Sequence, residues 1–84
     1  MQVRSGAPKK YARGEIVEMY CGHLDPAGRT VTDWLPGQVV ATDHRMVAVK
    51  FDVDVFANNG WLIPDRTLWC AHGSRHLRRA TPTS

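Results

Sequence analysis

The stretch that decides the fold is Val47-Ala48-Val49-Lys50-Phe51-Asp52-Val53-Asp54-Val55. Its odd positions hold large apolar side chains, and three of the four residues between them are charged. Successive side chains of a strand point to opposite faces of a sheet, so this alternation predicts a half-buried β-strand over residues 47–55. Its apolar side chains, Phe51 among them, are expected to face the core.

A hairpin signal follows this strand at Asn59-Gly60, because both residues tolerate the positive φ of a tight two-residue turn. We therefore expect a fourth strand over 61–71, interrupted at Pro64, which has no N–H to donate to a ladder. The two-residue loop sets a register that pairs Phe51 with Leu68, Val49 with Cys70, and Lys50 with Trp69. Trp69 then faces outward and Cys70 inward.

Three further strands complete the expected sheet. Period-two patterns predict strands at 15–21, 38–41 and 76–78, with Leu77 inward in the last, and no window shows a helical period. Turns are expected at Asp25-Pro26-Ala27-Gly28, at Asp43-His44-Arg45 and at Gly73-Ser74-Arg75. Either Val39 or Val40 can face inward, so the register of the second strand stays open. Five short strands with a long first loop predict a small barrel, because closure removes exposed sheet edges.

The length of 84 residues favours a single domain. A chain this short buries only about 60% of the surface that its unfolded form exposes, so it needs a closed sheet or a partner subunit. We expect a flexible basic arm at 1–11, the barrel at 12–79 and a disordered tail at 80–84. No apolar run approaches the ~20 residues of a membrane span, and the first residues do not resemble a secretory signal, so a cytoplasmic protein is expected.

Four motifs of the chain resemble one family of small barrels. They are Gly14-Glu15-Ile16-Val17-Glu18, Trp34-Leu35-Pro36-Gly37-Gln38-Val39-Val40, Val47-Ala48-Val49-Lys50-Phe51-Asp52 and Leu77-Arg78. Over residues 12–79 the chain looks like an SH3-like barrel of the Tudor or agenet kind. The resemblance implies a non-enzymatic domain that binds methylated lysine or arginine in an aromatic cage, or binds nucleic acid or peptides. The implied cage consists of Tyr20, Trp34 and Phe51, with Asp52 as its acid.

A second, local resemblance rests on the stretch Gly14-Glu15-Ile16-Val17-Glu18-Met19-Tyr20-Cys21-Gly22-His23-Leu24-Asp25-Pro26-Ala27-Gly28-Arg29-Thr30-Val31. This stretch looks like part of the plasmid-borne type II dihydrofolate reductases, which are SH3-like barrels that form tetramers around a central pore. The pore motif of that family, Val-Gln-Ile-Tyr, does not occur in this chain. The resemblance implies an oligomeric enzyme that binds a nicotinamide cofactor, which is a remote alternative for the function.

The basic residues are concentrated at the two ends of the chain, whose net charge is +3. Residues 1–14 and 66–84 each carry four bases and no acid, whereas residues 15–65 hold all eight acids and three bases. In an SH3-like barrel the last strand lies beside the first, so the two basic ends are expected to form one patch that binds phosphates. Its candidate residues are Lys9, Lys10, Arg13, Arg75, Arg78 and Arg79. Two solvated tails are the alternative interpretation of these charges.

Four aromatic side chains are candidate contacts for a partner, namely Tyr20, Trp34, Trp61 and Trp69. Exposed rings stack nucleobases in nucleic-acid binders, and they are also enriched at protein interfaces. The partner expected from the charge is nucleic acid or an acidic protein surface. The exposed rings make a homo-oligomer a second expectation.

Two similar segments, Cys21-Gly22-His23 and Cys70-Ala71-His72, allow three interpretations. Cys21 has the parity of Val17 and Met19, which favours core thiols, with the histidines as polar residues at strand ends. Four nitrogen and sulfur ligands would also suit zinc, and two cysteines would form a disulfide in an oxidising compartment. The zinc set would consist of Cys21, His23, Cys70 and His72.

Catalysis has little support in the sequence. The chain contains no glycine-rich phosphate loop and no nucleophile elbow, so we expect neither an enzyme nor a cofactor. The sequence favours a binding or adaptor module that takes an acidic partner through its basic patch. Protein interaction or homo-oligomerisation through exposed aromatic residues is the alternative.

Overall fold

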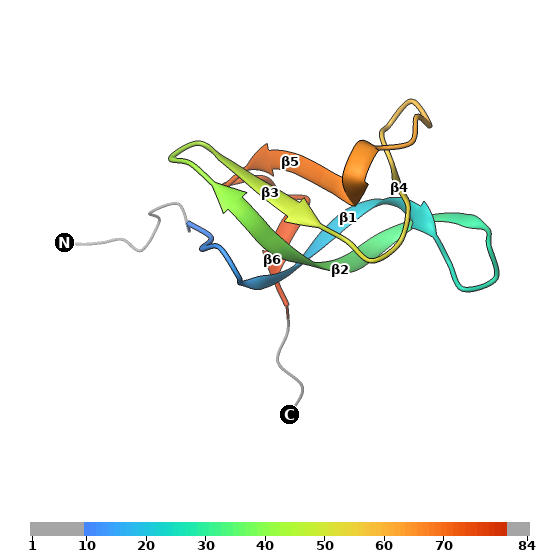
Figure 1. Ribbon diagram of the computed structural model, residues 1–84, viewed down its shortest axis with the longest axis horizontal. Helices are drawn as coiled ribbons and strands as arrows, with labels where there is room; N and C mark the ends of the chain where they lie inside the picture. The colour runs from blue at the N-terminus through green and yellow to red at the C-terminus, as the bar shows by residue number, and fades with distance from the viewer. Residues whose placement is uncertain (1–9, 81–84) are drawn as a thin grey trace.

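The computed structural model describes residues 10–80, which form an all-β, nearly closed antiparallel barrel (Figure 1). Its strands are β1 (Ile16–Leu24), β2 (Thr30–Thr42), β3 (Met46–Lys50), β4 (Val55–Phe56), β5 (Thr67–Ala71) and β6 (Leu77–Arg79), with a 3₁₀ turn, η1 (Pro64–Arg66), before β5. The strand order is β4-β1-β2-β3-β5, and β6 pairs with the same edge of β1 as β4 does. The predicted all-β class is confirmed, and the barrel is compatible with an SH3-like fold.

β1 and β2 are longer than the sequence predicted because they pair along the whole of β1. Their register runs from Ile16 opposite Gln38 to Leu24 opposite Thr30. The turn between them is the predicted one, in which the Asp25 carboxylate accepts from the amides of Ala27 and Arg29, each at 2.9 Å. Most of the segment that was expected to be a long first loop is therefore strand.

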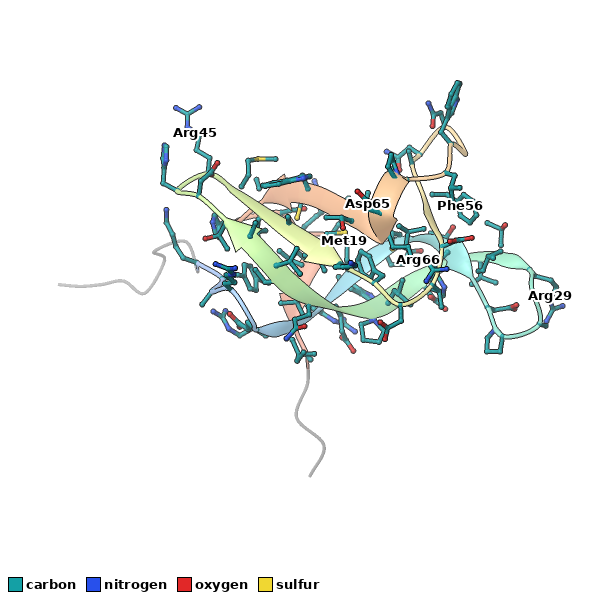
Figure 2. The ribbon with its side chains drawn as sticks, viewed as in Figure 1. Met19, Arg29, Arg45, Phe56, Asp65 and Arg66 are labelled. Atoms are coloured by element: carbon teal, nitrogen blue, oxygen red, sulfur yellow. The ribbon has the colours of Figure 1, made fainter. Side chains whose placement is uncertain are left out.

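The alternating stretch 47–55 does not form one strand. β3 ends at Lys50, and the chain then bends and returns to β1 as β4. The Arg66 side chain holds this bend (Figure 2), because its Nε donates to Asp54 Oδ1 at 3.0 Å and Nη1 donates to the Asp52 carbonyl at 3.1 Å. The predicted faces are nevertheless retained, since the buried residues of this stretch include Val47, Val49, Phe51 and Val55.

The hairpin at Asn59-Gly60 has a longer loop than predicted. Gly60 donates its N–H to the Ala57 carbonyl at 2.8 Å, and Ala57 donates to the Trp61 carbonyl at 2.8 Å. Only Gly60 of the two turn residues has a positive φ, so the prediction of a tight two-residue turn was wrong. A single bridge between Phe56 and Leu62 closes the hairpin.

The expected fourth strand, 61–71, is broken at Pro64 as predicted, and only its second half becomes β5. Asp65 and Arg66 adopt left-handed φ values of 58° and 53°, and Figure 2 shows them where the chain enters β5. The prediction of a two-residue hairpin loop placed these residues within the fourth strand. In the structure they form a turn instead. The register of β5 therefore depends on η1 as well as on the hairpin.

β5 pairs with β3 two residues away from the predicted register. The observed pairs are Val49 with Leu68, Ala48 with Trp69, Val47 with Cys70, and Lys50 with Thr67. A shift of two residues keeps every side chain on its predicted face of the sheet. Leu68 and Cys70 therefore pack against the core, and Trp69 is 56% exposed on the outer face. Lys50 lies opposite Thr67 instead of beside Trp69.

The centre of the barrel is filled by valine side chains. The largest fully buried side chains are those of Val17, Val39, Val47, Val49 and Val55, so Val39 is the inward residue of its pair. A Cβ built on Gly37 would lie 2.7 Å from Phe51 Cε1 and 2.7 Å from Val49 Cγ1. Glycine at this position lets the Phe51 ring pack directly against β2.

Tyr11, which the sequence assigned to the arm, is buried against the barrel. Its N–H donates to His72 Nδ1 at 3.1 Å, and its hydroxyl donates to the Leu77 carbonyl at 3.3 Å. Residues 1–9 of the predicted arm and 81–84 of the predicted tail lie outside the described residues. The described part of the chain contains no helix that is long and apolar enough to cross a membrane.

Candidate binding surface

A row of three rings lies on the outer side of β1, β2 and the turn before β6. Tyr20 of β1 is directly opposite Trp34 of β2, and their ring centroids are 5.6 Å apart in an edge-to-face arrangement. His76 lies 6.1 Å from the Tyr20 ring at an angle of 28° between the planes. We call His76, Tyr20 and Trp34 the aromatic row. The β1–β2 register brings Tyr20 to Trp34, and the Tyr20 N–H donates to the His76 carbonyl at 2.8 Å, so tertiary structure brings these three rings together.

Arg78 extends the aromatic row at the Trp34 end. Its guanidinium carbon lies 3.8 Å from the centre of the Trp34 ring, which is a close cation–π contact. The same side chain donates through Nε to Glu18 Oε1 at 2.7 Å, since Arg78 of β6 is opposite Glu18 of β1. The guanidinium is therefore held between an indole face and a carboxylate, and part of its charge is offset.

Arg79 forms the second ion pair between β6 and the N-terminal region. Its Nε lies 2.6 Å from Glu15 Oε2, and its Nη2 donates to the Lys10 carbonyl at 3.0 Å. The guanidinium carbon also lies 4.8 Å from the centre of the Tyr11 ring. Arg79 thus ties the entry to β1 onto β6, which gives it a structural role.

The two predicted basic ends do meet, because β6 pairs with β1, but two acids meet them. Glu15 and Glu18 belong to the acidic middle of the chain by sequence, yet the register places them beside Arg79 and Arg78. Residues 10–80 hold nine Lys and Arg against eight Asp and Glu. The described part of the domain is therefore nearly neutral, in contrast to the basic patch that the sequence predicted.

The other predicted phosphate contacts lie apart from these pairs. Lys10 donates from Nζ to the His44 carbonyl at 2.7 Å. Arg13 and Arg75 are exposed, and neither has an acidic partner within residues 10–80. Arg75 immediately precedes His76 of the aromatic row. Lys9 lies outside the described residues.

The remaining two aromatic candidates do not join the aromatic row. Trp61 is 72% exposed in the loop after β4, and Trp69 lies on the outer face of β5. Phe51, which the Tudor resemblance implied as a cage wall, is buried in the core as its strand parity predicted. Only Tyr20 and Trp34 of that implied cage come together, and His76, which the sequence did not single out, supplies the third ring.

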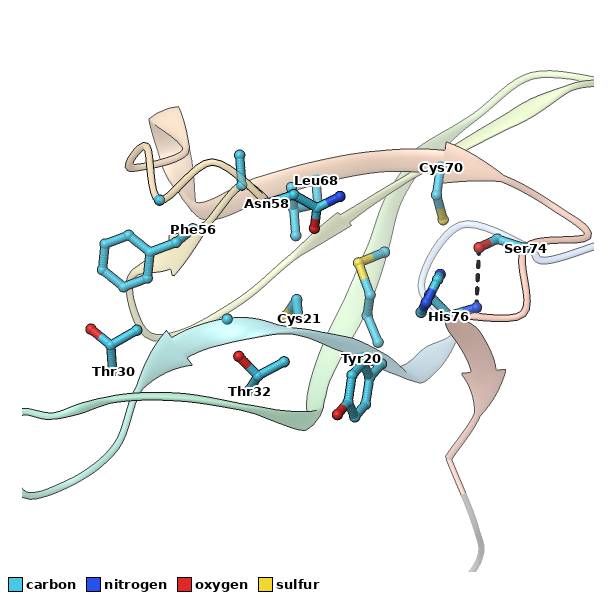
Figure 3. Close-up of a pocket in the computed structure, with 14 residues that line it drawn as sticks. Tyr20, Cys21, Thr30, Thr32, Phe56, Asn58, Leu68, Cys70, Ser74 and His76 are labelled. Atoms are coloured by element: carbon cyan, nitrogen blue, oxygen red, sulfur yellow. Dashed lines mark hydrogen bonds between the residues drawn. The ribbon is translucent and has the colours of Figure 1, made fainter.

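A groove of about 780 Å³ separates β1 from β5 next to the aromatic row (Figure 3). Its lining includes Met19, Cys21, Leu68 and Cys70, together with Thr and Asn side chains. Tyr20 and His76 lie at one end of it. Its lining among the described residues contains no Lys, Arg, Asp or Glu. The groove is thus a neutral opening into the side of the barrel.

Both cysteines are free thiols that pack against the core, which agrees with the core-thiol interpretation. Burial raises the pKa of Cys21 to about 11, with a further contribution from the Asp33 carboxylate, and burial also raises the pKa of Cys70. Since the thiolate is the nucleophile and the metal ligand, protonated thiols are poorly suited to either role.

The two histidines of the Cys-x-His segments are buried rather than exposed at strand ends, with 7% of His23 and 6% of His72 accessible. Both ring nitrogens of each histidine lie within hydrogen-bond distance of protein groups. Within residues 10–80, no three His, Cys, Asp or Glu side chains gather closely enough to hold a metal ion. The alternative zinc set of Cys21, His23, Cys70 and His72 is therefore not assembled.

Comparison of the chain with protein-family models, with curated proteins and with solved structures finds no match in any of the three.

Proposed function

We propose that this domain is a non-enzymatic binding module that holds a single strand of nucleic acid across the aromatic row. The observation that supports the proposal is the grouping of three rings and one guanidinium on one outer surface. Aromatic rings and guanidinium planes are the groups on which proteins stack unpaired bases. The phosphates of such a strand would meet Arg75 and Arg78 beside the rings.

Stacking, more than charge, is expected to provide the affinity. Glu15 and Glu18 offset Arg79 and Arg78, so few cations remain to displace counterions from a bound strand. Each phosphate contact adds about −0.7 to the slope of log affinity against log salt for a single strand, so the six predicted bases together would give about −4. We expect a slope of roughly −0.7 to −1.4, because only one or two of these bases would act.

The test is the affinity for a fluorescent mixed-sequence DNA or RNA oligonucleotide, measured by anisotropy at several salt concentrations. Tyr20→Ala and Trp34→Ala should each weaken binding by about 5- to 150-fold, because one stacked base contributes about 1–3 kcal/mol. Trp61→Ala is the matched control, since Trp61 is more exposed than Tyr20 and lies outside the aromatic row. Its affinity should equal that of the unaltered protein.

An acidic protein partner would give a different result in the same assay. Polyglutamate would then displace the oligonucleotide, and Arg75→Ala would weaken binding more than Tyr20→Ala does. That outcome, or an oligonucleotide affinity unaffected by either ring substitution, would contradict stacking on the aromatic row.

The reductase alternative that follows from the local resemblance has less support from the groove. The groove lining contains no Lys or Arg among the described residues, whereas protein sites that hold cofactor phosphates use such side chains. A titration with a reduced nicotinamide cofactor, followed by its fluorescence, tests this alternative directly. Saturable binding would favour the enzyme over the binding module.

A further inference from the structure

Within residues 10–80, the second edge of β5 has no neighbouring strand. β5 ends the strand order and pairs only with β3, and the groove lies between it and β1 (Figure 3). Phe51 donates its N–H to the Arg66 carbonyl at 2.9 Å, and His72 donates to the Arg45 carbonyl at 3.2 Å. Hydrogen-bonded pairs alternate along an antiparallel ladder, so Leu68 and Cys70 bond to β3 between these two bonds. Thr67, Trp69 and Ala71 therefore direct their backbone groups to the open edge.

Two of the six backbone groups on this edge already have partners. The Thr67 N–H donates to the Pro64 carbonyl, and the Ala71 carbonyl accepts from Ser74 at 3.1 Å. Four groups have no backbone partner within residues 10–80: the Thr67 carbonyl, the Trp69 N–H and carbonyl, and the Ala71 N–H. The free and occupied groups are arranged symmetrically about Trp69.

The edge lacks the features that prevent sheets from pairing with one another. Natural edge strands carry charged side chains, prolines or bulges that block addition of another strand. β5 reads Thr67-Leu68-Trp69-Cys70-Ala71, with no charge and no proline, and its pairing with β3 has no bulge. Trp69, at the centre, is 56% exposed on the outer face. Such a strand is a template for another β-strand.

We propose that β5 pairs, antiparallel and edge to edge, with β5 of a second copy of this chain, with a two-fold axis at Trp69. In this register Trp69 exchanges two hydrogen bonds with the partner's Trp69. The Ala71 N–H of each copy donates to the partner's Thr67 carbonyl. All four free groups of each edge are then satisfied. The Thr67 N–H faces the partner's Ala71 carbonyl, and each of these two groups already has a hydrogen bond within its own chain.

A second copy is favoured over an unrelated peptide because the free backbone groups of the edge are arranged symmetrically about Trp69. Two identical edges related by a two-fold axis at Trp69 therefore satisfy each other's free groups. An isologous contact of this kind closes after two subunits. It also gives a chain of 84 residues the partner subunit that a small core needs. The aromatic row lies on β1, β2 and the turn before β6 and supplies none of the hydrogen-bonding groups of this contact. Tyr20 and His76 line one end of the groove beside the β5 edge, and the dimer would carry two rows.

Size-exclusion chromatography with light scattering tests the assembly. The unaltered protein should have twice the 9.4 kDa mass of one chain, and Trp69→Lys should have the mass of one chain. Two like charges would face each other at the axis, which disfavours strand pairing. The matched control is Trp61→Lys, because Trp61 is 72% exposed and lies off the edge, and it should remain a dimer. A monomeric unaltered protein, a dimeric Trp69→Lys variant or a monomeric Trp61→Lys variant would overturn the proposal.

Cross-linking tests the register itself, and it does not depend on the folding of the Trp69 variant. The axis at Trp69 places Leu68 of one copy opposite the partner's Cys70, in a non-hydrogen-bonded pair with Cα atoms about 4.5 Å apart, which suits a disulfide. Leu68→Cys in a Cys21→Ala background should form a covalent dimer with oxidised glutathione as the oxidant. Adding Cys70→Ala should abolish that dimer. If no covalent dimer forms, or if it persists without Cys70, the proposed register is incorrect.

Discussion

The two Cys-x-His segments look alike in sequence, yet their histidines have opposite hydrogen-bond environments. His23 Nε2 pairs with the Asp33 carboxylate and Nδ1 lies 3.0 Å from the Leu24 carbonyl, so both nitrogens face acceptors. His72 Nδ1 accepts from the Tyr11 N–H, and Nε2 donates to the Asp43 carbonyl at 2.8 Å. Two acceptors favour the imidazolium form of His23, whereas the His72 ring accepts one hydrogen bond and donates the other.

The difference shows that the hydrogen-bond partners of a buried histidine, and not the Cys-x-His motif, determine its role. His23 joins the paired strands β1 and β2 through a carboxylate that is itself exposed. His72 joins the N-terminal segment to the turn between β2 and β3, and its ring stacks on Tyr11 with centroids 6.2 Å apart. His72 therefore connects three segments of the fold through its two hydrogen bonds, whereas His23 is paired with a single carboxylate.

Replacing His72 is expected to give the largest effect on stability. In His72→Ala the buried Tyr11 N–H loses its acceptor, and an unsatisfied buried group costs about 1–3 kcal/mol. The carbonyl of the exposed residue Asp43 also loses its donor, but water can replace it. We expect the free energy of unfolding in urea to fall by roughly 2 kcal/mol. His44→Ala, an exposed residue of the neighbouring turn, is the matched control and should change it by less than about 0.5 kcal/mol. Equal losses in the two variants would contradict the structural role of His72.

A smaller, pH-dependent effect is expected at His23. Burial lowers its pKa, but the hydrogen bonds to Asp33 and Leu24 and the nearby carboxylates outweigh burial, so the pKa is raised above 6.5. A pKa that is higher in the folded state adds stability below the unfolded value and loses it as pH rises through the folded value. Urea unfolding should therefore show stability from His23 at pH 6 that is lost at higher pH.

The carboxylate partner provides the test of this assignment. Asp33→Asn should flatten the decrease in stability above pH 6, because the neutral amide forms no ion pair with an imidazolium. Asp52→Asn, which alters an exposed acid away from His23, should retain it. The His23 ring should also titrate above 6.5 by NMR in the unaltered protein. An Asp33→Asn variant with the same pH profile as the unaltered protein would show that another group is responsible.

The faces of the strands could be predicted from the sequence, whereas their register could not. Alternation is local, so the inward positions of Val47, Val49 and Phe51 survive even though their strand ends at Lys50. The β3–β5 register depends on the Ala57–Trp61 loop and on the left-handed turn at 65–66. Asn59-Gly60 marks the hairpin but not the length of its loop, and no glycine marks the left-handed turn. A strand register wrong by two residues was therefore compatible with every apolar pattern in the chain.

The candidate surface was predicted only in part for the same reason. Tyr20 and Trp34 were singled out as exposed rings, but their contact follows from the β1–β2 register. Counting charges by segment hid the pairing of Glu18 with Arg78, because these residues are 60 positions apart. Such contacts are set by tertiary structure, so a count of charges by segment left out the acids that lie beside Arg78 and Arg79.

The smallest expected effect is a difference between the alkylation rates of the two cysteines. Burial raises the pKa of both thiols, but only Cys21 also has the Asp33 carboxylate as a cause. Asp33→Asn should accelerate the reaction of Cys21 with iodoacetamide at pH 8 by up to about 5-fold, since an exposed charge contributes at most about 1 kcal/mol. Cys70 serves as the internal control, and mass spectrometry of the two alkylated peptides measures both rates in one sample. Equal acceleration of both thiols would mean that the substitution opens the groove between β1 and β5. The reactivity of Cys21 would then be limited by its burial and not by the charge of Asp33.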